Sequence, residues 1–184
     1  MEKMMTRTIL TVDLVSLKTE EHEEFIKANQ ESFNYGALEE FGPRHTYFEE
    51  EGQVIARNTI LRSLQHGQAY WIILDGRRVG GLILMIEGER GELETLFTTP
   101  TIHSKGIGFA AWIAVEQTFP QVKIWETVTP YYDQRNIHFY VNRCGFHVVE
   151  YYNRFHQEPI LGEENHNMLE QFPEGFFRFE KQMQ

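Results

Sequence analysis

Apolar and β-branched residues gather in three short segments near the middle of the chain, with polar turns between them. The segments are Ala69–Leu74, Val79–Ile86 and Glu92–Thr98, and their length and composition are typical of β-strands. Asp75–Arg78 and Gly88–Gly91 separate them and have the composition of tight hairpin turns. The pattern therefore predicts an antiparallel meander of three strands.

Helical spacing of apolar residues dominates the region before the meander. We expect a strand over Thr6–Leu14, a helix over Thr19–Phe33 and a second helix over Val54–Gln65, in which apolar residues recur at helical intervals. The glycine, proline and aromatic residues of Gly36–Phe48 break the helical pattern. This segment is expected to connect the two helices.

Helical and strand patterns alternate after the meander. The expected elements are a helix from about Gly106 to Pro120, a strand over Val122–Thr127, a helix over Gln134–Arg143, and strands over Gly145–Tyr152 and Gly175–Lys181. The whole order predicts an α+β fold with a mixed, mostly antiparallel twisted sheet of about seven strands and helices on both faces. The length of 184 residues fits one domain, and we assign residues 1–184 to it.

Acidic residues outnumber basic residues by 27 to 17, which gives a net charge of −10. Because phosphate neutralisation needs a basic face, we expect no nucleic-acid partner. An acidic surface attracts cations such as amines by long-range steering. The simpler interpretation is that the charge keeps the protein in solution.

Three features of the sequence indicate the cellular compartment and whether a metal is bound: the cysteine count, the length of the apolar runs and the spacing of the histidines. The single cysteine, Cys144, cannot form an internal disulfide, which fits a reducing compartment. The longest apolar run, Gly80–Ile86, is much shorter than the roughly 20 residues of a spanning helix, and the first residues lack a signal-peptide pattern. We expect a cytoplasmic protein without membrane contact. The histidines show no HxxxH or paired Cys/His spacing, so we expect no metal.

A glycine-containing loop follows the third strand of the meander. Pro100 ends the strand, and Gly106 and Gly108 open the next helix. The first turn of a helix binds phosphate groups through unpaired N–H groups and the positive end of the dipole. Glycine leaves the backbone open to the anion, while Lys105 adds a charge and Ser104 a hydroxyl. The segment therefore predicts a phosphate-binding site.

This segment resembles the acetyl-CoA-binding motif of the GNAT superfamily of N-acetyltransferases. The motif is a strand, a proline and then R/Q-x-x-G-x-G/A at a helix start; Pro100 and His103–Gly108 match it, with His103 in place of Arg or Gln. The resemblance implies acetyl-CoA as co-substrate, with its pyrophosphate on His103, Ser104, Lys105, Gly106, Ile107, Gly108 and Phe109. It also implies a splay between the fourth and fifth strands, where backbone groups of Leu96, Phe97 and Thr98 pair with pantetheine and polarise the thioester oxygen.

The same glycines also fit a different cofactor motif. Gly106–Ala111 reads as GxGxxA, and Glu126 lies 20 residues beyond Gly106, as in a dinucleotide-binding unit. In that unit the strand leads almost directly into the first glycine. Here Thr99–Lys105 intervene, and an antiparallel meander precedes them. We therefore prefer the acetyl-CoA interpretation.

A second segment resembles the same superfamily. Asn136–Phe146 is similar to its ending N-x(n)-[FL]-Y-x-x-x-G-F, in which the tyrosine faces the thioester sulfur. The resemblance implies that Tyr140 is the general acid and that Asn136 is one of the cofactor-binding residues. One extra residue separates Tyr140 from Gly145, and a gapless count from Gly145 puts Val141 in the tyrosine's place. The sequence leaves open which of the two faces the sulfur.

Acetyl transfer to an amine needs a base, because a lysine-type amine with a pKa of about 10.4 is mostly protonated near neutrality. The candidates are Glu126 on the fifth strand and Glu94 on the fourth, where Glu92 points the same way. The function that follows is direct N-acetyl transfer from acetyl-CoA to a primary amine of a small molecule or peptide. The alternative is a non-catalytic acyl-CoA-binding module with a regulatory role. The sequence does not identify the acceptor and leaves a homodimer open.

Overall fold

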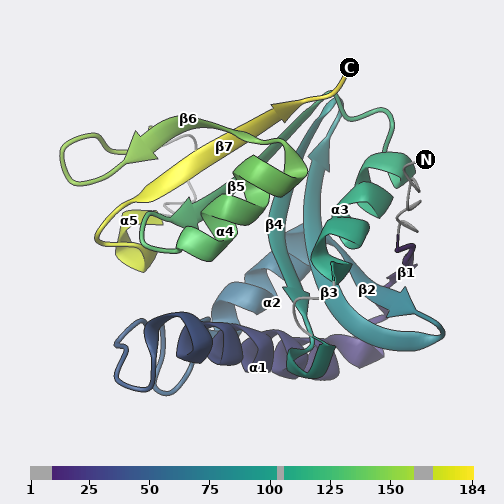
Figure 1. The fold of residues 1–184 in the computed structure, drawn as a ribbon, viewed down its shortest axis with the longest axis horizontal. Helices are drawn as coiled ribbons and strands as arrows, with labels where there is room; N and C mark the ends of the chain where they lie inside the picture. Colours follow the sequence, from purple (N-terminus) through teal and green to yellow (C-terminus); the bar gives the residue numbers. More distant parts are fainter. Residues whose placement is uncertain (1–9, 103–105, 160–167) are drawn as a thin grey trace, which may run out of the picture.

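A seven-stranded sheet organises the protein, as the computed structural model in Figure 1 shows. The structure describes residues 10–102, 106–159 and 168–184. Neighbouring strands are antiparallel except β4 and β5, which are parallel. The strand order in the sheet is β1-β2-β3-β4-β5-β7-β6. The strands are β1 Asp13–Ser16, β2 Gln68–Leu74, β3 Arg77–Glu87, β4 Arg90–Thr98, β5 Ile124–Pro130, β6 His147–Tyr152 and β7 Phe176–Gln182. The predicted mixed, mostly antiparallel sheet is confirmed.

Helices cover both faces of the sheet (Figure 1). Leu82 and Leu84 of β3 pack in the core beneath α3, whereas Ile83 between them packs beneath α1 and α2 on the opposite face. The helices are α1 His22–Phe41, α2 Arg57–His66, α3 Ile107–Thr118, α4 Gln134–His138 and α5 Met168–Gln171, with short turns η1 Thr19–Glu21, η2 Pro100–Ile102 and η3 Phe139–Cys144. The arrangement gives β4 and β5 a helical layer on each side.

Aromatic side chains hold these layers against the sheet. Trp112 of α3 packs edge-on against Trp125 of β5, with ring centroids 5.4 Å apart. On the opposite face, Phe25 of α1 lies 5.1 Å from both Trp71 and Phe97. Full burial of a phenylalanine side chain contributes roughly 1.5–3 kcal/mol. These contacts fix α3 over β5 and α1 over β4.

The first helix is longer than the sequence predicts. The pattern predicts an end at Phe33 and places Gly36 in a connection, but α1 continues through Gly36 to Phe41. The residues that follow Gly36 are mostly Ala, Leu and Glu, which are good helix formers. The helix stops at Gly42, whose φ of 79° favours glycine. The prediction of a helix end before an isolated glycine is therefore wrong.

Smaller differences lie at the ends of elements. β1 is observed at Asp13–Ser16 instead of Thr6–Leu14, of which residues 6–9 lie outside the described residues. The second helix starts at Arg57, and α5 lies within a polar stretch for which the pattern predicts no element. A four-residue helix is barely one turn long and leaves no periodic signal. Within the described ranges, no helix has the length and apolar character needed to cross a membrane.

Candidate active site

β4 and β5 pair over three rungs and then separate (Figure 1). The last rung joins Glu92 to Glu126. Thr127, the next residue of β5, donates a hydrogen bond from its hydroxyl to the carbonyl oxygen of Leu93 at 2.9 Å. This bond marks the apex of the gap between the two strands. The predicted splay between the fourth and fifth strands is confirmed.

A β-bulge lies in β4 immediately after the apex. On the β3 side Leu84 pairs with Leu93 and Ile83 pairs with Thr95, so Glu94 is an extra residue in β4. A bulge bends its strand and increases the local twist. The bulge therefore accounts for the departure of β4 from β5.

The peptide groups of β4 beyond the bulge do not all face the gap. A Cβ atom at Gly80 of β3 would lie 2.1 Å from the carbonyl oxygen of Phe97, so that oxygen points towards β3. Successive residues of an antiparallel strand direct their peptide groups to opposite sides, so those of Leu96 and Thr98 face the gap. The Thr98 carbonyl oxygen accepts a hydrogen bond from the Ser32 hydroxyl at 2.7 Å. Of the three positions predicted to pair with pantetheine, Leu96 and Thr98 thus have the required direction.

The start of α3 lies beside this gap. Gly106 is the N-cap residue with a φ of 81°, and no atom of the described residues lies within 4 Å of a Cβ placed there. Ala110 donates to the Gly106 carbonyl at 3.0 Å, and the amides of Ile107, Gly108 and Phe109 precede the first helical bond. Open space and amides without a partner inside the helix suit a phosphate group. The other predicted members of this cradle lie outside the described residues: His103, Ser104 and Lys105.

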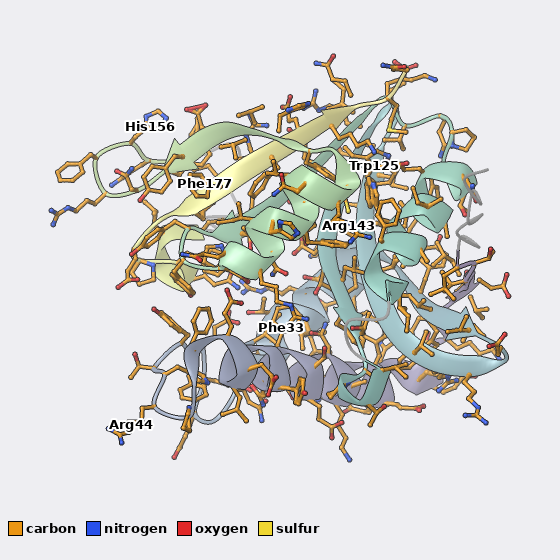
Figure 2. The ribbon with its side chains drawn as sticks, in the orientation of Figure 1. Phe33, Arg44, Trp125, Arg143, His156 and Phe177 are labelled. Carbon is orange, nitrogen blue, oxygen red and sulfur yellow. The ribbon has the colours of Figure 1, made fainter. Side chains whose placement is uncertain are left out.

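Arg143 is a basic residue beside the start of α3 to which the sequence analysis assigns no role. Its guanidinium carbon lies 5.3 Å from the centre of the Phe109 ring, and Figure 2 shows the side chain between η3 and α3. Phe139 of η3 also faces α3, because a Cβ at Gly108 would lie 3.4 Å from its ring. Arg143 therefore adds positive charge where the predicted anion would lie. Its signal in the sequence is its place within the second motif.

A π-helical turn, η3, follows α4 where the sequence predicts one continuous α-helix over Gln134–Arg143. The amides of Gly145 and Phe146 both donate to the Tyr140 carbonyl oxygen, the second at 2.9 Å. A π turn closes its hydrogen bond over one residue more than an α turn. The turn therefore accommodates the extra residue between Tyr140 and Gly145.

Tyr140 reaches the apex of the gap from the α3–α4 face. Its phenol contacts the side chain of Thr127, and its ring lies 5.7 Å from Phe146 and 5.8 Å from Phe179. Only 7% of Tyr140 is exposed, and this burial raises the pKa of the phenol. The phenol is therefore a proton donor at neutral pH. Val141 lies at the partly buried edge of the same core.

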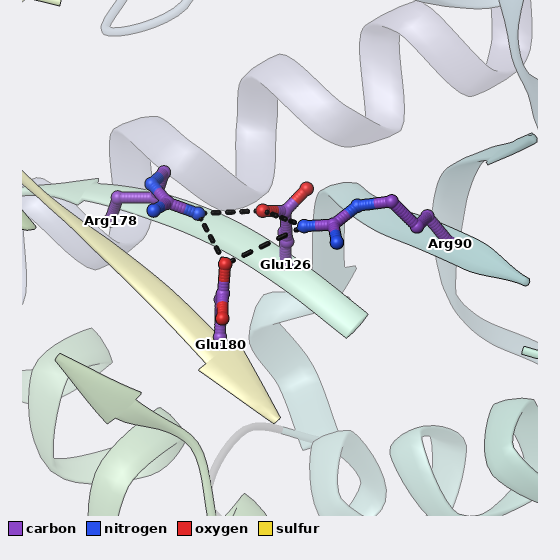
Figure 3. Close-up of polar contacts among 4 residues, drawn as sticks. All are labelled: Arg90, Glu126, Arg178 and Glu180. Carbon is purple, nitrogen blue, oxygen red and sulfur yellow. Dashed lines mark hydrogen bonds and ion pairs between the residues drawn. The ribbon is translucent and has the colours of Figure 1, made fainter. Parts of the chain in front are cut away.

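Glu126 belongs to an ion-pair network on the opposite face (Figure 3). Its Oε1 accepts hydrogen bonds from Arg90 at 2.8 Å and from Arg178 at 2.6 Å. Glu180 pairs with the same two arginines, at 3.5 and 2.6 Å. Two positive charges thus balance two carboxylates. Glu126 lies at the apex, near the start of β5, and its Oε1 is already engaged by two donors.

Glu92 and Glu94 lie on the same face as Glu126. Glu94 accepts a hydrogen bond from the Ser63 hydroxyl of α2 at 2.8 Å. Burial raises the pKa of Glu92 to about 7, and the charges of Glu94 and Glu126 act in the same direction. A carboxyl group with this pKa accepts a proton near neutrality. The sequence shows the three carboxylates but not which one has its pKa raised by partial burial.

Asn136 is held at the start of α4. Its backbone amide donates to Asp133 Oδ1 at 2.9 Å, and its side-chain amide donates to Oδ2 at 2.7 Å. The side-chain oxygen of Asn136 and the second hydrogen of its side-chain amide remain for a cofactor contact. No group of three or more His, Cys, Asp or Glu residues that could hold a metal ion is found in the part of the chain that the structure describes.

Comparisons with known proteins identify the family. The profile of the acetyltransferase (GNAT) family matches residues 19–146. The chain is 38% identical over 187 residues to the uncharacterized protein YrkN of Bacillus subtilis (strain 168), with 98% of each chain covered. It is also similar in fold to an acetyltransferase from Thermus thermophilus, with a TM-score of 0.65, 16% identity and coverage of 95% of this chain and 99% of that one. A Bacillus subtilis acetyltransferase in complex with CoA gives a TM-score of 0.58 and 14% identity, with 95% and 99% covered. The chain belongs to the acetyltransferase (GNAT) family.

Proposed function

We propose that the protein transfers an acetyl group from acetyl-CoA directly to a primary amine of a small molecule or peptide. The observation that carries this proposal is the pair of groups at the apex of the β4–β5 gap. A buried phenol, Tyr140, approaches from the α3–α4 face, and a partly buried carboxyl group, Glu92, lies on the α1–α2 face. An acid and a base on opposite sides of one point are what direct acyl transfer to an amine requires.

Acetyl-CoA enters this scheme from the α3–α4 face. The amides at the start of α3 hold the pyrophosphate, Arg143 neutralises part of its charge, and the peptide groups of Leu96 and Thr98 pair with pantetheine. The Bacillus subtilis structure with bound CoA supports this choice of co-substrate, because the two proteins share the fold. The acceptor approaches from the α1–α2 face, where Glu92 and Glu94 lie.

The transfer follows from these positions. Glu92 takes a proton from the acceptor ammonium, and the neutral nitrogen attacks the thioester carbonyl. The C–N bond forms while the C–S bond breaks, the acylated nitrogen releases its second proton to solvent, and Tyr140 gives its proton to the departing thiolate. The phenol then recovers a proton from solvent. The Glu126 carboxylate is engaged by Arg90 and Arg178 on the acceptor side and takes no proton in this scheme.

A mass-shift screen with acetyl-CoA and an amine panel tests the proposal. The panel includes polyamines, amino acids, aminoglycosides, peptide N-termini and lysine peptides, and each product should gain one acetyl group as free thiol appears. Acetyl-CoA should also raise the melting temperature, because a ligand at 100-fold its Kd stabilises the native state by about 2.7 kcal/mol. A shift with NAD and none with acetyl-CoA would instead support the dinucleotide interpretation of Gly106–Ala111.

The burial of Tyr140 favours one alternative, a non-catalytic acyl-CoA-binding module. Tyr140 packs in the core with Phe146 and Phe179, as a purely structural residue would. Both functions use the same cradle, so CoA binding does not distinguish them. Release of free thiol that depends on an amine distinguishes them, because the module binds the thioester without turnover.

A further inference from the structure

Lys181 of β7 joins the end of η3 to α3. Its Nζ donates a hydrogen bond to the Cys144 carbonyl oxygen at 2.7 Å and forms an ion pair with Glu116 of α3. The side chains of Lys181 and Glu116 are 21% and 15% exposed, so solvent screens their attraction less than at an open surface. The Nζ atom also lies 5.8 Å from the centre of the Trp112 ring. One side chain thus connects three elements.

The hydrogen bond from Lys181 to the Cys144 carbonyl oxygen lies at the C-terminal end of η3, where carbonyl groups lack a donor within the helix. Cys144 is the last residue of η3, and the last carbonyl groups of a helix find no donor within it. A positive charge at this end is favourable, because the helix dipole is negative there. Because π turns are rarer than α turns, a hydrogen-bond donor from outside the helix favours the π turn over the α turn in this segment.

The balance between π and α turns decides which side chain faces the apex. Gly145 has a φ of 80° and Phe146 is fully buried, so the end of the helix is fixed. Each residue of an α-helix is rotated by about 100° from the one before it. Counted back from Gly145 in an α-helix, Val141 would take the direction that Tyr140 has in the π turn.

We propose that Lys181 is a positioning residue that holds η3 as a π turn and thereby presents Tyr140 to the apex of the β4–β5 gap. Its effect on catalysis rests on the proposed transferase function. Its effect on the position of Tyr140 does not.

The position of Tyr140 is tested by NMR of protein labelled with 3-fluorotyrosine, with the Tyr140 signal assigned by its loss in Tyr140→Phe. Lys181→Met keeps the aliphatic stem and removes the donor and charge. It should shift the Tyr140 signal and lower the pKa of its phenol, whereas Lys181→Arg should restore both. The matched control is Lys123→Met, because Lys123 also donates to a carbonyl oxygen, that of Pro120 at 3.3 Å, which belongs to the connection between α3 and β5 and not to η3. An unchanged Tyr140 signal in Lys181→Met would overturn the proposal.

Kinetics test the consequence for the reaction. Lys181→Met should lower kcat about tenfold to a hundredfold, up to the lower end of the range for loss of a general acid, without a change in the Kd for acetyl-CoA. In a Tyr140→Phe background the same substitution should cause no further loss, because both changes remove one interaction. Additive losses would contradict a role through Tyr140.

If the wild type transfers no acetyl group, the proposed function fails and the NMR result alone decides on Lys181. Should Lys181→Met not fold, Glu116→Gln replaces it in both measurements, with the same expected outcomes.

Discussion

Glu92 and Glu126 are partners on the last rung between β4 and β5, yet their carboxylates have opposite electrostatic surroundings. Glu126 accepts hydrogen bonds from Arg90 and Arg178. Glu92 is partly buried, and its pKa is raised to about 7 by desolvation and by the charges of Glu94 and Glu126. A carboxyl group with a raised pKa can accept a proton near neutrality, whereas a carboxylate that already accepts hydrogen bonds from two arginines is not available for that role. We therefore infer that Glu92, rather than Glu126, is the base.

Glu92→Gln should lower kcat at neutral pH by about a hundredfold or more, because the amide cannot accept the proton of the acceptor. In the wild type, kcat should fall as pH decreases through about 7, where Glu92 becomes protonated. The variant should lack this limb of the pH profile. Glu94→Gln and Glu126→Gln are the comparisons. A limb that persists in Glu92→Gln and disappears in one of these variants would assign the base to that residue.

Stability should depend on pH through the same carboxyl group. The pKa of Glu92 is about 7 in the folded protein, raised from its ordinary value of 4.5. A group whose pKa is raised on folding contributes its full stabilisation at pH values below its unfolded pKa. This contribution is lost as the pH rises through its folded pKa. The loss is about 3 kcal/mol at 1.36 kcal/mol per pKa unit. Denaturant unfolding should show Glu92→Gln gaining stability relative to the wild type between about pH 5 and about pH 8. A difference that does not vary over this range would mean that Glu92 titrates normally.

Arg143→Ala should weaken acetyl-CoA binding by about tenfold, because it removes a positive charge beside the predicted pyrophosphate position. The matched control is Arg154→Ala. Arg154 also lies over an aromatic ring, with its guanidinium carbon 4.5 Å from the centre of Phe155, but it is in the connection between β6 and β7. Calorimetric titration at two salt concentrations measures the effect, which should decrease at high salt. Equal Kd values for the two variants would remove Arg143 from the cofactor site.

Gly108→Val should abolish the acetyl-CoA-induced rise in melting temperature and leave the unliganded fold largely intact. A Cβ at this position meets the Phe139 ring at 3.4 Å, which is ordinary contact, but the branched side chain takes space next to the amides that would hold the phosphate. Gln117→Val adds the same residue to an exposed position late in α3 and should keep the shift. A folded Gly108→Val protein that still binds CoA would place the anion elsewhere.

The sheet and the start of α3 could be predicted because their signals are local. Strand-forming runs, hairpin turns and the pair Gly106 and Gly108 lie within a few residues of the structure that they determine. The surroundings of Glu126 could not be predicted in this way. Arg90 and Arg178 are 36 and 52 residues away along the chain, and the sheet brings them together.

The π turn could not be predicted for a different reason. The residues of Phe139–Cys144 are compatible with an α-helix, and a π turn changes the hydrogen-bond pattern rather than the residue types. The sequence does reveal that one residue is in excess between Tyr140 and Gly145. It cannot show how the backbone accommodates that residue, because the partner at the end of the turn, Lys181, comes from β7.

Tyr140→Phe should lower kcat by about a hundredfold, the lower end of the range for a general acid, because a CoA thiolate is a fair leaving group. The hydroxyl matters when charge develops on sulfur, so its loss should affect the transition state and leave the Kd for acetyl-CoA almost unchanged. Val141→Ala is the control, because Val141 would face the apex in place of Tyr140 if the segment were a regular α-helix. Steady-state kinetics with the best amine, together with calorimetric Kd values, separate the two effects. Unchanged kcat in a folded, CoA-binding Tyr140→Phe protein would show that Tyr140 only packs against Phe146 and Phe179, and that the thiolate leaves without its help.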